Sequence, residues 1–376
     1  MDLSSEQRAI RDAVREVAVE EIRPSARECD REQRFPEDAW DTLADIDVTG
    51  LTVPEAYGGL AVDRSTYAVV NEAVAYGSLS VATALSVHCL ATSCIAEFGD
   101  EDLRASWLPE MVEGRPVGAF ALSEPQAGSN PRQMSTVARR EGDEYVLDGE
   151  KAWITNGKRS GVVIVFAKTD LDDPDSVTQF LVPKDADGLT VGEKEEKLGL
   201  RASDTTTLSF DGVRIPASNR LTEEGRGLAA ALSILTGGRI GIAAQAVGLS
   251  QAAIDETVAY VTQREQFDGP ISDIQSVRHT LAEMETTIRA GRELTHAAAA
   301  AMDRGEHART SASVAKYFAT EGAVDVTEQA VQLHGGYGYT TEFDVERFYR
   351  DAKVTTIYEG TSQIQKNVIA RELLGE

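Results

Sequence analysis

One carboxylate stands out for the chemistry it could do. Glu359 lies in the string Ile-Tyr-Glu-Gly-Thr-Ser-Gln, among apolar and small residues, just before a helix that Thr361 or Ser362 could cap. A carboxylate in apolar surroundings is a stronger base, because burial disfavours its charged form and raises its pKa. This segment could therefore present a base to a bound ligand.

Three other segments carry groups that could line the same ligand site. Residues 120–130 are predicted to be a strand that runs into a loop of small residues with free amides and hydroxyls. Residues 151–157 end a second strand with the Trp153 ring beside the Thr155 hydroxyl. Residues 332–339 form a glycine-rich break between helices. Each segment alone is a weak signal, but a ligand-shaped gap would use all four.

Motifs of several other enzyme classes are absent from the sequence. It has no P-loop, no HExxH, no CxxC and no GxSxG elbow. Residues 225–230 match a GxGxxA dinucleotide string, yet they follow Thr222-Glu223-Glu224 instead of a strand, so we interpret them as a turn that opens a helix. The five histidines show no metal-ligand spacing, and we expect them to be structural.

The elements that must position these segments fall into three regions. Helical spacing dominates at the beginning of the chain, short β-rich runs follow, and long Ala-rich helical segments return after Gly227. We predict an α+β fold with an N-terminal helical domain (1–116), a middle antiparallel β domain (117–222) and a C-terminal helical domain (223–376). Strands and helices do not alternate, which argues against a doubly wound nucleotide fold.

Turn signals divide the predicted β domain. Asp148-Gly149 and Asp211-Gly212 lie between β-rich runs and are predicted to be turns, and residues 170–175 are predicted to be a hairpin tip. At the helical ends of the chain, Ser4 or Ser5 could cap the first helix and Gly375 could end the last one.

The charge balance excludes one class of partner. The 376 residues hold 62 acidic and 37 basic side chains, a formal charge of −25, and only 9 of the basic residues are Lys. Such a field repels phosphate backbones, so we expect no nucleic-acid partner. An acidic, lysine-poor surface suits solvation at very high salt, and we interpret the source as halophilic.

The apolar and cysteine patterns indicate a soluble cytoplasmic protein. Residues 73–96 carry no formal charge and are long enough to span a bilayer, but their many Ser and Thr residues favour buried helices, and we expect no membrane association. The first residues lack the features of a signal peptide. Cys29, Cys89 and Cys94 are odd in number and have no metal or redox spacing, which fits a reduced compartment.

In these segments and their order, the chain resembles the acyl-CoA dehydrogenase family. The resemblance runs through nearly the whole sequence and rests on the SEPxAGS loop, the WITNG strand, Arg264-Glu265-Gln266-Phe267, the QLHGGYGY segment and YEGTSQIQ. It implies FAD between the β domain and the C-terminal helices, and oxidation of an acyl-CoA to its trans-2-enoyl form. A flavin needs nearby donors because negative charge develops on it as it accepts hydride.

The resemblance also implies a role for particular residues. Ser129, Arg239, Tyr358 and Gly360 match positions expected at the substrate, and Glu359 matches the base that removes the α-proton. Positions expected to contact FAD are Phe120, Leu122, Ser123, Ser129, Trp153, Thr155, Arg264, Gln275, Gln332, Gly336, Thr361 and Gln363. Of these, Arg264, Gln275, Gln332 and Gly336 correspond to contacts with the pyrophosphate and adenosine, where FAD reaches a neighbouring subunit.

Two positions bear on substrate choice. Some family members carry the base on an earlier helix, immediately before the residue that corresponds to Arg239, where this chain has Gly238. Ala82 aligns with the site at which glutaryl-CoA dehydrogenases carry an Arg, which leaves no obvious partner for a distal carboxylate. These positions favour a short straight or methyl-branched acyl-CoA.

The expected partners are an electron-transfer flavoprotein and further copies of the chain, in a homotetramer built from two dimers. Two alternatives remain open at this point. One is an acyl-CoA oxidase, in which oxygen takes the electrons, although typical oxidases of this kin are longer. The other is a non-catalytic helical scaffold that kept the fold, which the presence of Glu359, Arg264 and Trp153 disfavours.

Overall fold

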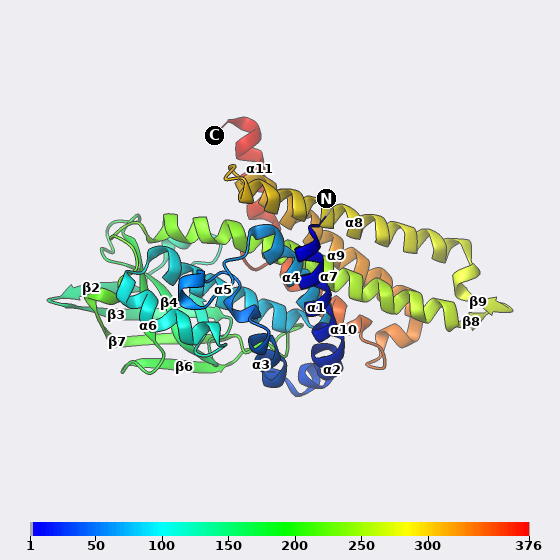
Figure 1. Cartoon of the computed structure of the whole chain (residues 1–376), viewed down its shortest axis with the longest axis horizontal. Helices are drawn as coiled ribbons and strands as arrows, with labels where there is room; N and C mark the ends of the chain where they lie inside the picture. The colour runs from blue at the N-terminus through cyan, green and yellow to red at the C-terminus, as the bar shows by residue number, and fades with distance from the viewer. Residues whose placement is uncertain (1–2, 376) are drawn as a thin grey trace.

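A computed structural model describes residues 3–375 and confirms the α+β class, with helices first, then strands, then helices (Figure 1). The N-terminal helices are α1 (Ser5–Val17), α2 (Arg23–Glu32), α3 (Glu37–Asp45), α4 (Arg64–Gly77), α5 (Leu79–Phe98) and α6 (Glu101–Val112). The strands that follow are β1 (Val117–Ala121), β2 (Val137–Glu141), β3 (Glu144–Ile154), β4 (Ser160–Lys168), β5 (Val177–Pro183), β6 (Leu189–Lys194) and β7 (Thr206–Pro216). The chain continues through α7 (Gly227–Gln263), the short strands β8 (Glu265–Gln266) and β9 (Gly269–Pro270), α8 (Gln275–Asp303), α9 (Arg309–His334), α10 (Val345–Thr355) and α11 (Ser362–Leu374).

Helix ends follow the capping residues seen in the sequence. Ser4 caps α1 in a capping box, in which its hydroxyl accepts from the Gln7 amide and the Gln7 side chain accepts from the Ser4 amide. Thr361 caps α11 by accepting from the Ile364 amide at 3.3 Å. Gly375 ends the same helix in the left-handed conformation, with φ +70°. The segment that carries Glu359 therefore ends at a capped helix start, at Thr361.

The β domain is not purely antiparallel as predicted. Seven strands form one sheet in the order β1-β4-β2-β3-β7-β6, with β5 paired to β4, and β1 lies parallel to β4. Residues 170–175 connect the antiparallel strands β4 and β5, as predicted for a hairpin tip. The parallel pair is possible because β2 and β3 intervene between β1 and β4 along the chain, which gives the long connection that parallel strands require.

The two Asp-Gly pairs are not turns. Asp148-Gly149 lies inside β3 and Asp211-Gly212 lies inside β7, at the point where the pairing of these two strands shifts register. The Asp148 carboxylate accepts from the Gly212 amide at 2.7 Å, and Gly212 has φ +63°. Glycine supplies the unusual backbone that a bulge needs, so the same residue pair that favours a turn here bends two long strands instead.

Residues 73–96 form buried helices rather than one span. They are divided between α4 and α5 by an extended residue, Ser78. By length and composition α5 could cross a membrane, as could α7, but 94% of the apolar window of α5 and 67% of that of α7 are buried inside the fold. Core helices of this kind explain the low charge of the stretch.

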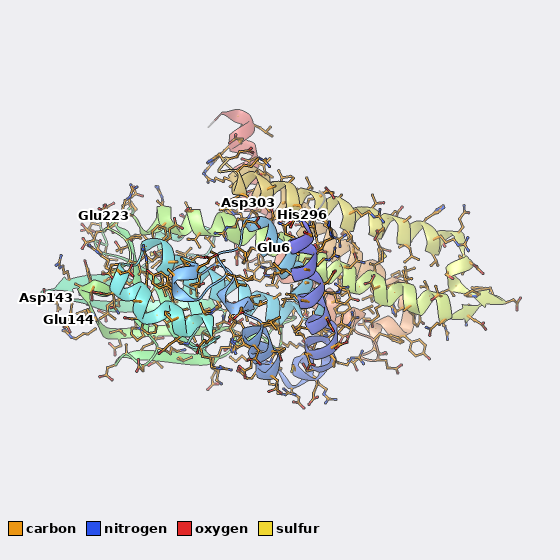
Figure 2. The ribbon with its side chains drawn as sticks, in the orientation of Figure 1. Glu6, Asp143, Glu144, Glu223, His296 and Asp303 are labelled. Carbon is orange, nitrogen blue, oxygen red and sulfur yellow. The ribbon has the colours of Figure 1, made fainter. Side chains whose placement is uncertain are left out.

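One long helix connects the two ends of an elongated molecule. In Figure 1, α7 runs from the β domain toward the β8–β9 hairpin at the opposite end, and α8 returns alongside it. The α4 and α5 helices pack against the middle of α7, while α9 packs along both α7 and α8. The start of α4 is tied to the end of α8, because Asp303 accepts from the Arg64 and Ser65 amides at 2.6 and 3.0 Å (Figure 2).

Candidate active site

Glu359 lies in the short connection between α10 and α11. Both Glu359 and Gly360 have left-handed backbones, with φ +50° and +93°. The Glu359 Oε2 atom is buried and has no hydrogen-bond partner among residues 3–375. It lies so close to α7 that a Cβ on Gly238 would be 2.3 Å from it, with a Leu90 methyl next to the same point. Glycine at this position of α7 therefore makes room for the carboxylate.

Electrostatics make this carboxyl group a base suited to neutral pH. Burial raises the pKa of Glu359 to about 7, while the positive charges of Lys316 and Arg239 oppose the rise. A general base is most effective when its pKa lies near the working pH. The acyl chain of a substrate would exclude further water from the same atom.

The other residues expected at the substrate end differ in what they can contact. Arg239 follows Gly238 on α7 and is buried, and two of its guanidinium nitrogens have no partner among the described residues. The Tyr358 hydroxyl is instead turned into the core, near Thr83 Oγ1 at 3.3 Å and Gln245 Oε1 at 3.4 Å. The Gly360 carbonyl accepts hydrogen bonds from the Lys316 ammonium and the Gln365 side-chain amide. The Tyr358 side chain is thus used for packing, and any substrate contact there would come from the backbone.

The residues expected at the flavin ring come together where β1 and β3 end. β1 runs into the loop that carries Leu122 and Ser123, and the Ala152 amide at the end of β3 donates to the Ser123 carbonyl at 3.0 Å. This bond brings Trp153 and Thr155 next to that loop. The Phe120 ring packs at a tilt against Phe166, with ring centroids 4.8 Å apart, and the apolar cluster that it joins also contains Leu90, the neighbour of the Glu359 carboxylate.

These residues fit a flavin. The Trp153 side chain is 57% exposed although it is large and apolar, and its backbone is left-handed, with φ +57°. The hydroxyls of Ser123, Ser129 and Thr155 have no hydrogen-bond partner within the part of the chain that the structure describes. An uncovered aromatic ring beside free hydroxyl donors is what a flavin face requires.

A buried ion pair that the sequence did not reveal joins the loop after β1 to β3. Glu124 and Lys151 are both fully buried, with Oε1 and Nζ 2.8 Å apart. Glu124 also accepts from the Ser135 and Thr136 amides at 2.6 and 3.0 Å, and Lys151 donates to the Leu122 carbonyl at 3.3 Å. Burial acts to raise the pKa of Glu124, but Lys151 and these donors hold it at about 2, so the carboxylate stays charged.

Asn156 is a second positioning residue that the sequence analysis did not identify. Its side-chain amide donates to the Ala84 carbonyl on α5 at 2.9 Å and to the Gly118 carbonyl on β1 at 3.1 Å. Its backbone is left-handed, with φ +62°. A buried Asn in that conformation links the end of β3 to both neighbouring elements. Its position directly after Thr155 was the only available signal.

A second group of predicted cofactor residues lies at the other end of α7. Arg264 caps the C-terminal end of α7 and lines an open hollow of about 520 Å³ together with Gln332 and Gly336. The guanidinium lies 5.7 Å from the centre of the Tyr337 ring. Gln275 is exposed at the start of α8 and does not line this hollow, while Thr361 and Gln363 lie with Glu359 at the start of α11.

The two groups are far apart within one chain. Gly238 and Arg264 lie 26 residues apart, so at 1.5 Å per residue the helix separates them by about 39 Å. Side chains at either end of α7 cannot reach the other end. The hollow at Arg264 is therefore separate from the surroundings of Glu359 within one chain.

His88 takes a structural position in the core. His88 is fully buried, receives a hydrogen bond from the Gly118 amide at 3.0 Å and lies 3.2 Å from the Met111 carbonyl. Burial lowers its pKa to about 4, so it is neutral. Among residues 3–375, no three His, Cys, Asp or Glu side chains are grouped to hold a metal ion.

Comparison with known proteins gives the same three-part organisation. The sequence matches the acyl-CoA dehydrogenase N-terminal domain over residues 4–115, the middle domain over residues 119–213 and the C-terminal domain over residues 225–374. The fold is similar to that of butyryl-CoA dehydrogenase from Megasphaera elsdenii, with a TM-score of 0.97 and 37% identity over 100% of this chain and 99% of the other.

Two relatives show how little overall identity says about the substrate. The short-chain specific acyl-CoA dehydrogenase of Rattus norvegicus mitochondria is 39% identical over 100% of this chain and 91% of its own length. A 3-(aryl)acrylate reductase of Clostridium sporogenes is also 39% identical, over 100% of both chains. Equal similarity to two proteins with different activities means that the substrate must be argued from the site.

Proposed function

Because the chain belongs to the acyl-CoA dehydrogenase family, we propose that it converts a short straight or methyl-branched acyl-CoA to the trans-2-enoyl-CoA. The chain is an FAD-dependent oxidoreductase. Bound FAD supplies the acceptor for the hydride that leaves the β-carbon. The residues of the chain must then bind the thioester, orient it and remove the α-proton.

One observation carries this proposal: the buried, unpartnered Oε2 of Glu359. The α-C–H of a thioester is a weak acid, so its removal needs a carboxylate held near the carbon. Oε2 lies against α7 at Gly238, near the apolar cluster that contains Phe120 and Leu122. We infer that the acyl chain lies between this carboxylate and the flavin face and passes its α-proton to Oε2.

The preference for a short, uncharged acyl group rests on two positions. Gly238 offers no carboxylate on α7, so the base comes from the late position, Glu359. Ala82 is fully buried on α5, and its carbonyl accepts a hydrogen bond from the side-chain amide of Gln245 at 3.1 Å. Neither position supplies a cation for a distal carboxylate, which supports a monocarboxylic acyl-CoA.

We propose that electrons leave to an electron-transfer flavoprotein and that the enzyme is a homotetramer of two dimers. The separation between Gly238 and Arg264 supports a cofactor shared by two copies, because the hollow at Arg264 cannot serve the flavin ring of its own chain. We also propose a cytoplasmic location, which the three cysteines support, since all are buried and unpaired.

The decisive experiment is anaerobic bleaching of the flavin by a panel of acyl-CoAs. Purified protein should be yellow, and butyryl-, isobutyryl- or 2-methylbutyryl-CoA should reduce it faster than octanoyl- or glutaryl-CoA. Glu359→Gln should still bind FAD and acyl-CoA, but flavin reduction should slow by at least ~10²-fold, the lower range for a positioned base. A colourless preparation that cannot be reconstituted with FAD would favour the scaffold alternative.

A second measurement separates the dehydrogenase from the oxidase. The substrate-reduced enzyme should be reoxidised quickly by an electron-transfer flavoprotein and slowly by oxygen. Rapid reoxidation by air, with release of hydrogen peroxide, would instead support an oxidase.

A further inference from the structure

Lys316 is a buried lysine next to the segment that carries the base. It lies on α9 and is 1% exposed. Its ammonium donates to the Thr355 carbonyl at 3.1 Å and to the Gly360 carbonyl at 2.6 Å. Thr355 is the last residue of α10, and Gly360 directly follows Glu359. One side chain from a different helix therefore holds the backbone on both sides of Glu359.

The geometry of the segment explains why it needs such a contact. Glu359 has φ +50° and Gly360 has φ +93°, and a left-handed backbone is unfavourable for a residue with a Cβ. The Thr355 carbonyl is also one of the carbonyls that the end of a helix leaves unpaired, where a positive charge is favourable. Lys316 satisfies this carbonyl and restrains the turn in the same contact.

A neutral side chain shares part of this work. Gln365 on α11 is also fully buried, and its amide donates to the Gly360 carbonyl at 2.8 Å. Lys316 and Gln365 thus bond the same oxygen, but only Lys316 brings a charge. The pair allows the effect of the charge to be separated from the effect of the hydrogen bond.

The charge of Lys316 acts on the base itself. Burial raises the pKa of Glu359, and Lys316 is the larger of the two cationic influences that oppose this rise. In turn, burial lowers the pKa of Lys316 to about 8, and Glu359 opposes that fall. The charged and titratable groups around this pair are Arg239 on α7, Arg309 and Glu321 on α9, Tyr67 on α4 and the adjoining Tyr358.

We propose that Lys316 is a positioning residue for the α-proton abstraction: it fixes the backbone on both sides of Glu359 and supplies a positive charge that favours the ionised carboxylate. This inference rests on the proposed function, because it concerns the base of that reaction. Lys316 does not contact the substrate and acts only through Glu359.

The test is the pH dependence of flavin reduction in Lys316→Met, an uncharged variant of similar length. Loss of a nearby opposite charge should raise the apparent pKa of Glu359 by on the order of one unit. At pH 7 the ionised fraction would then fall from about one half to about one tenth, so reduction should slow about fivefold from the charge alone and recover at higher pH. Lys316→Arg should keep the wild-type midpoint.

Gln365→Met is the matched control. It removes a hydrogen bond to the same Gly360 carbonyl without removing a charge, so it should lower the rate at every pH and leave the midpoint unchanged. If Lys316→Met does not accumulate as folded protein, Lys316→Gln replaces it, because it keeps an amide donor and removes only the charge.

The outcomes separate this inference from the proposed function. A wild-type enzyme that no acyl-CoA reduces would overturn both. A wild-type enzyme that is reduced, beside a Lys316→Met or Lys316→Gln variant that is loaded with FAD and has an unchanged pH midpoint, would overturn the role of Lys316 alone. A shift in midpoint that Lys316→Arg reverses would support it.

Discussion

Gly238→Ala should test the position of the base without touching the base itself. An alanine Cβ at this point of α7 would lie 2.3 Å from Glu359 Oε2, whereas real Cβ contacts stay above 3.0 Å and are ordinary at 3.4 Å. The carboxylate must therefore retreat by about 0.7–1.1 Å. Because a misplacement of about 1 Å at a reacting group can cost on the order of 10²-fold in rate, we expect flavin reduction by acyl-CoA to slow by about that factor.

The fold itself should survive this substitution. The atom that must move is the far end of a flexible side chain, and alanine is favoured over glycine inside a helix by about 1 kcal/mol. Gly237→Ala is the matched control, because its Cβ would meet the Arg64 guanidinium at 3.1 Å instead of Glu359. The control should keep the wild-type rate, and both variants should keep the wild-type FAD content and unfolding midpoint.

Stopped-flow flavin reduction under anaerobic conditions is the assay. In the double variant with Glu359→Gln, Gly238→Ala should cause no further loss of rate if its effect passes through the base. A Gly238→Ala enzyme that holds FAD and is reduced at the wild-type rate would refute the reasoning, since the base would then not act from the position seen here.

Four further predictions concern pH, stability, assembly and salt. The rate of flavin reduction should rise with pH through about 7 as Glu359 ionises. The free energy of unfolding should fall between about pH 4.5 and 7, because ionisation of Glu359 is less favourable in the fold than in the unfolded chain. Unfolding midpoints measured against pH would check this, since Glu359→Gln should lose the fall that the wild type shows. Glu124→Gln should lower the free energy of unfolding in denaturant by about 3–5 kcal/mol, because it leaves Lys151 buried without its partner, and the double variant with Lys151→Met should recover part of the loss. Arg264→Ala should weaken FAD retention and shift sedimentation toward smaller species when flavin is limiting, whereas a stable, flavin-loaded monomer would contradict a shared cofactor. Activity, FAD content and oligomer mass should rise together with KCl, because the Debye length over which surface carboxylates repel one another falls from about 30 Å at 0.01 M to about 3 Å at 1 M. An enzyme fully active and tetrameric in low-salt buffer would contradict the halophilic interpretation.

Exposed acidic side chains of the kind that underlies the salt prediction lie on more than one domain. Figure 2 shows Asp143 and Glu144 at the tip of the hairpin between β2 and β3, and Glu223 also lies at the β-domain end. Glu6 lies at the start of α1, near the middle of the view. Repulsion at low salt would therefore act on the N-terminal helices and on the β domain at once.

Local sequence signals predicted the three-part order of the elements and selected Glu359 as the candidate base. The capping of α11 by Thr361 and the end of that helix at Gly375 follow from residue types that act within a few positions of themselves. The same local reasoning was wrong for Asp148-Gly149 and Asp211-Gly212. These pairs have the backbone freedom that a turn needs, but cross-strand pairing between β3 and β7 continues through them.

Contacts between distant segments could not be predicted from residue types. Lys316 and Gly360 are 44 residues apart, and the partner of the lysine is a backbone carbonyl, which leaves no mark in the sequence. Glu124 and Lys151 carry opposite charges but lie 27 residues apart, among many other acidic residues. Tyr358 was expected at the substrate end, and the partners of its hydroxyl on α5 and α7 are visible only in the folded chain.

The order in which the site is encoded has a consequence for biosynthesis. The last residue of the β domain expected at the flavin ring is Thr155, and about 200 further residues separate it from Glu359, which at 5–20 residues per second is about 10–40 s of translation. During that interval a nascent chain can complete the sheet, whose last strand ends at Pro216, but it lacks Glu359. For most of that time α9, with its lysine, has yet to be made. In the proposed reaction, proton abstraction can begin only after the late helices have docked, so an incomplete chain that captures a flavin would not consume acyl-CoA.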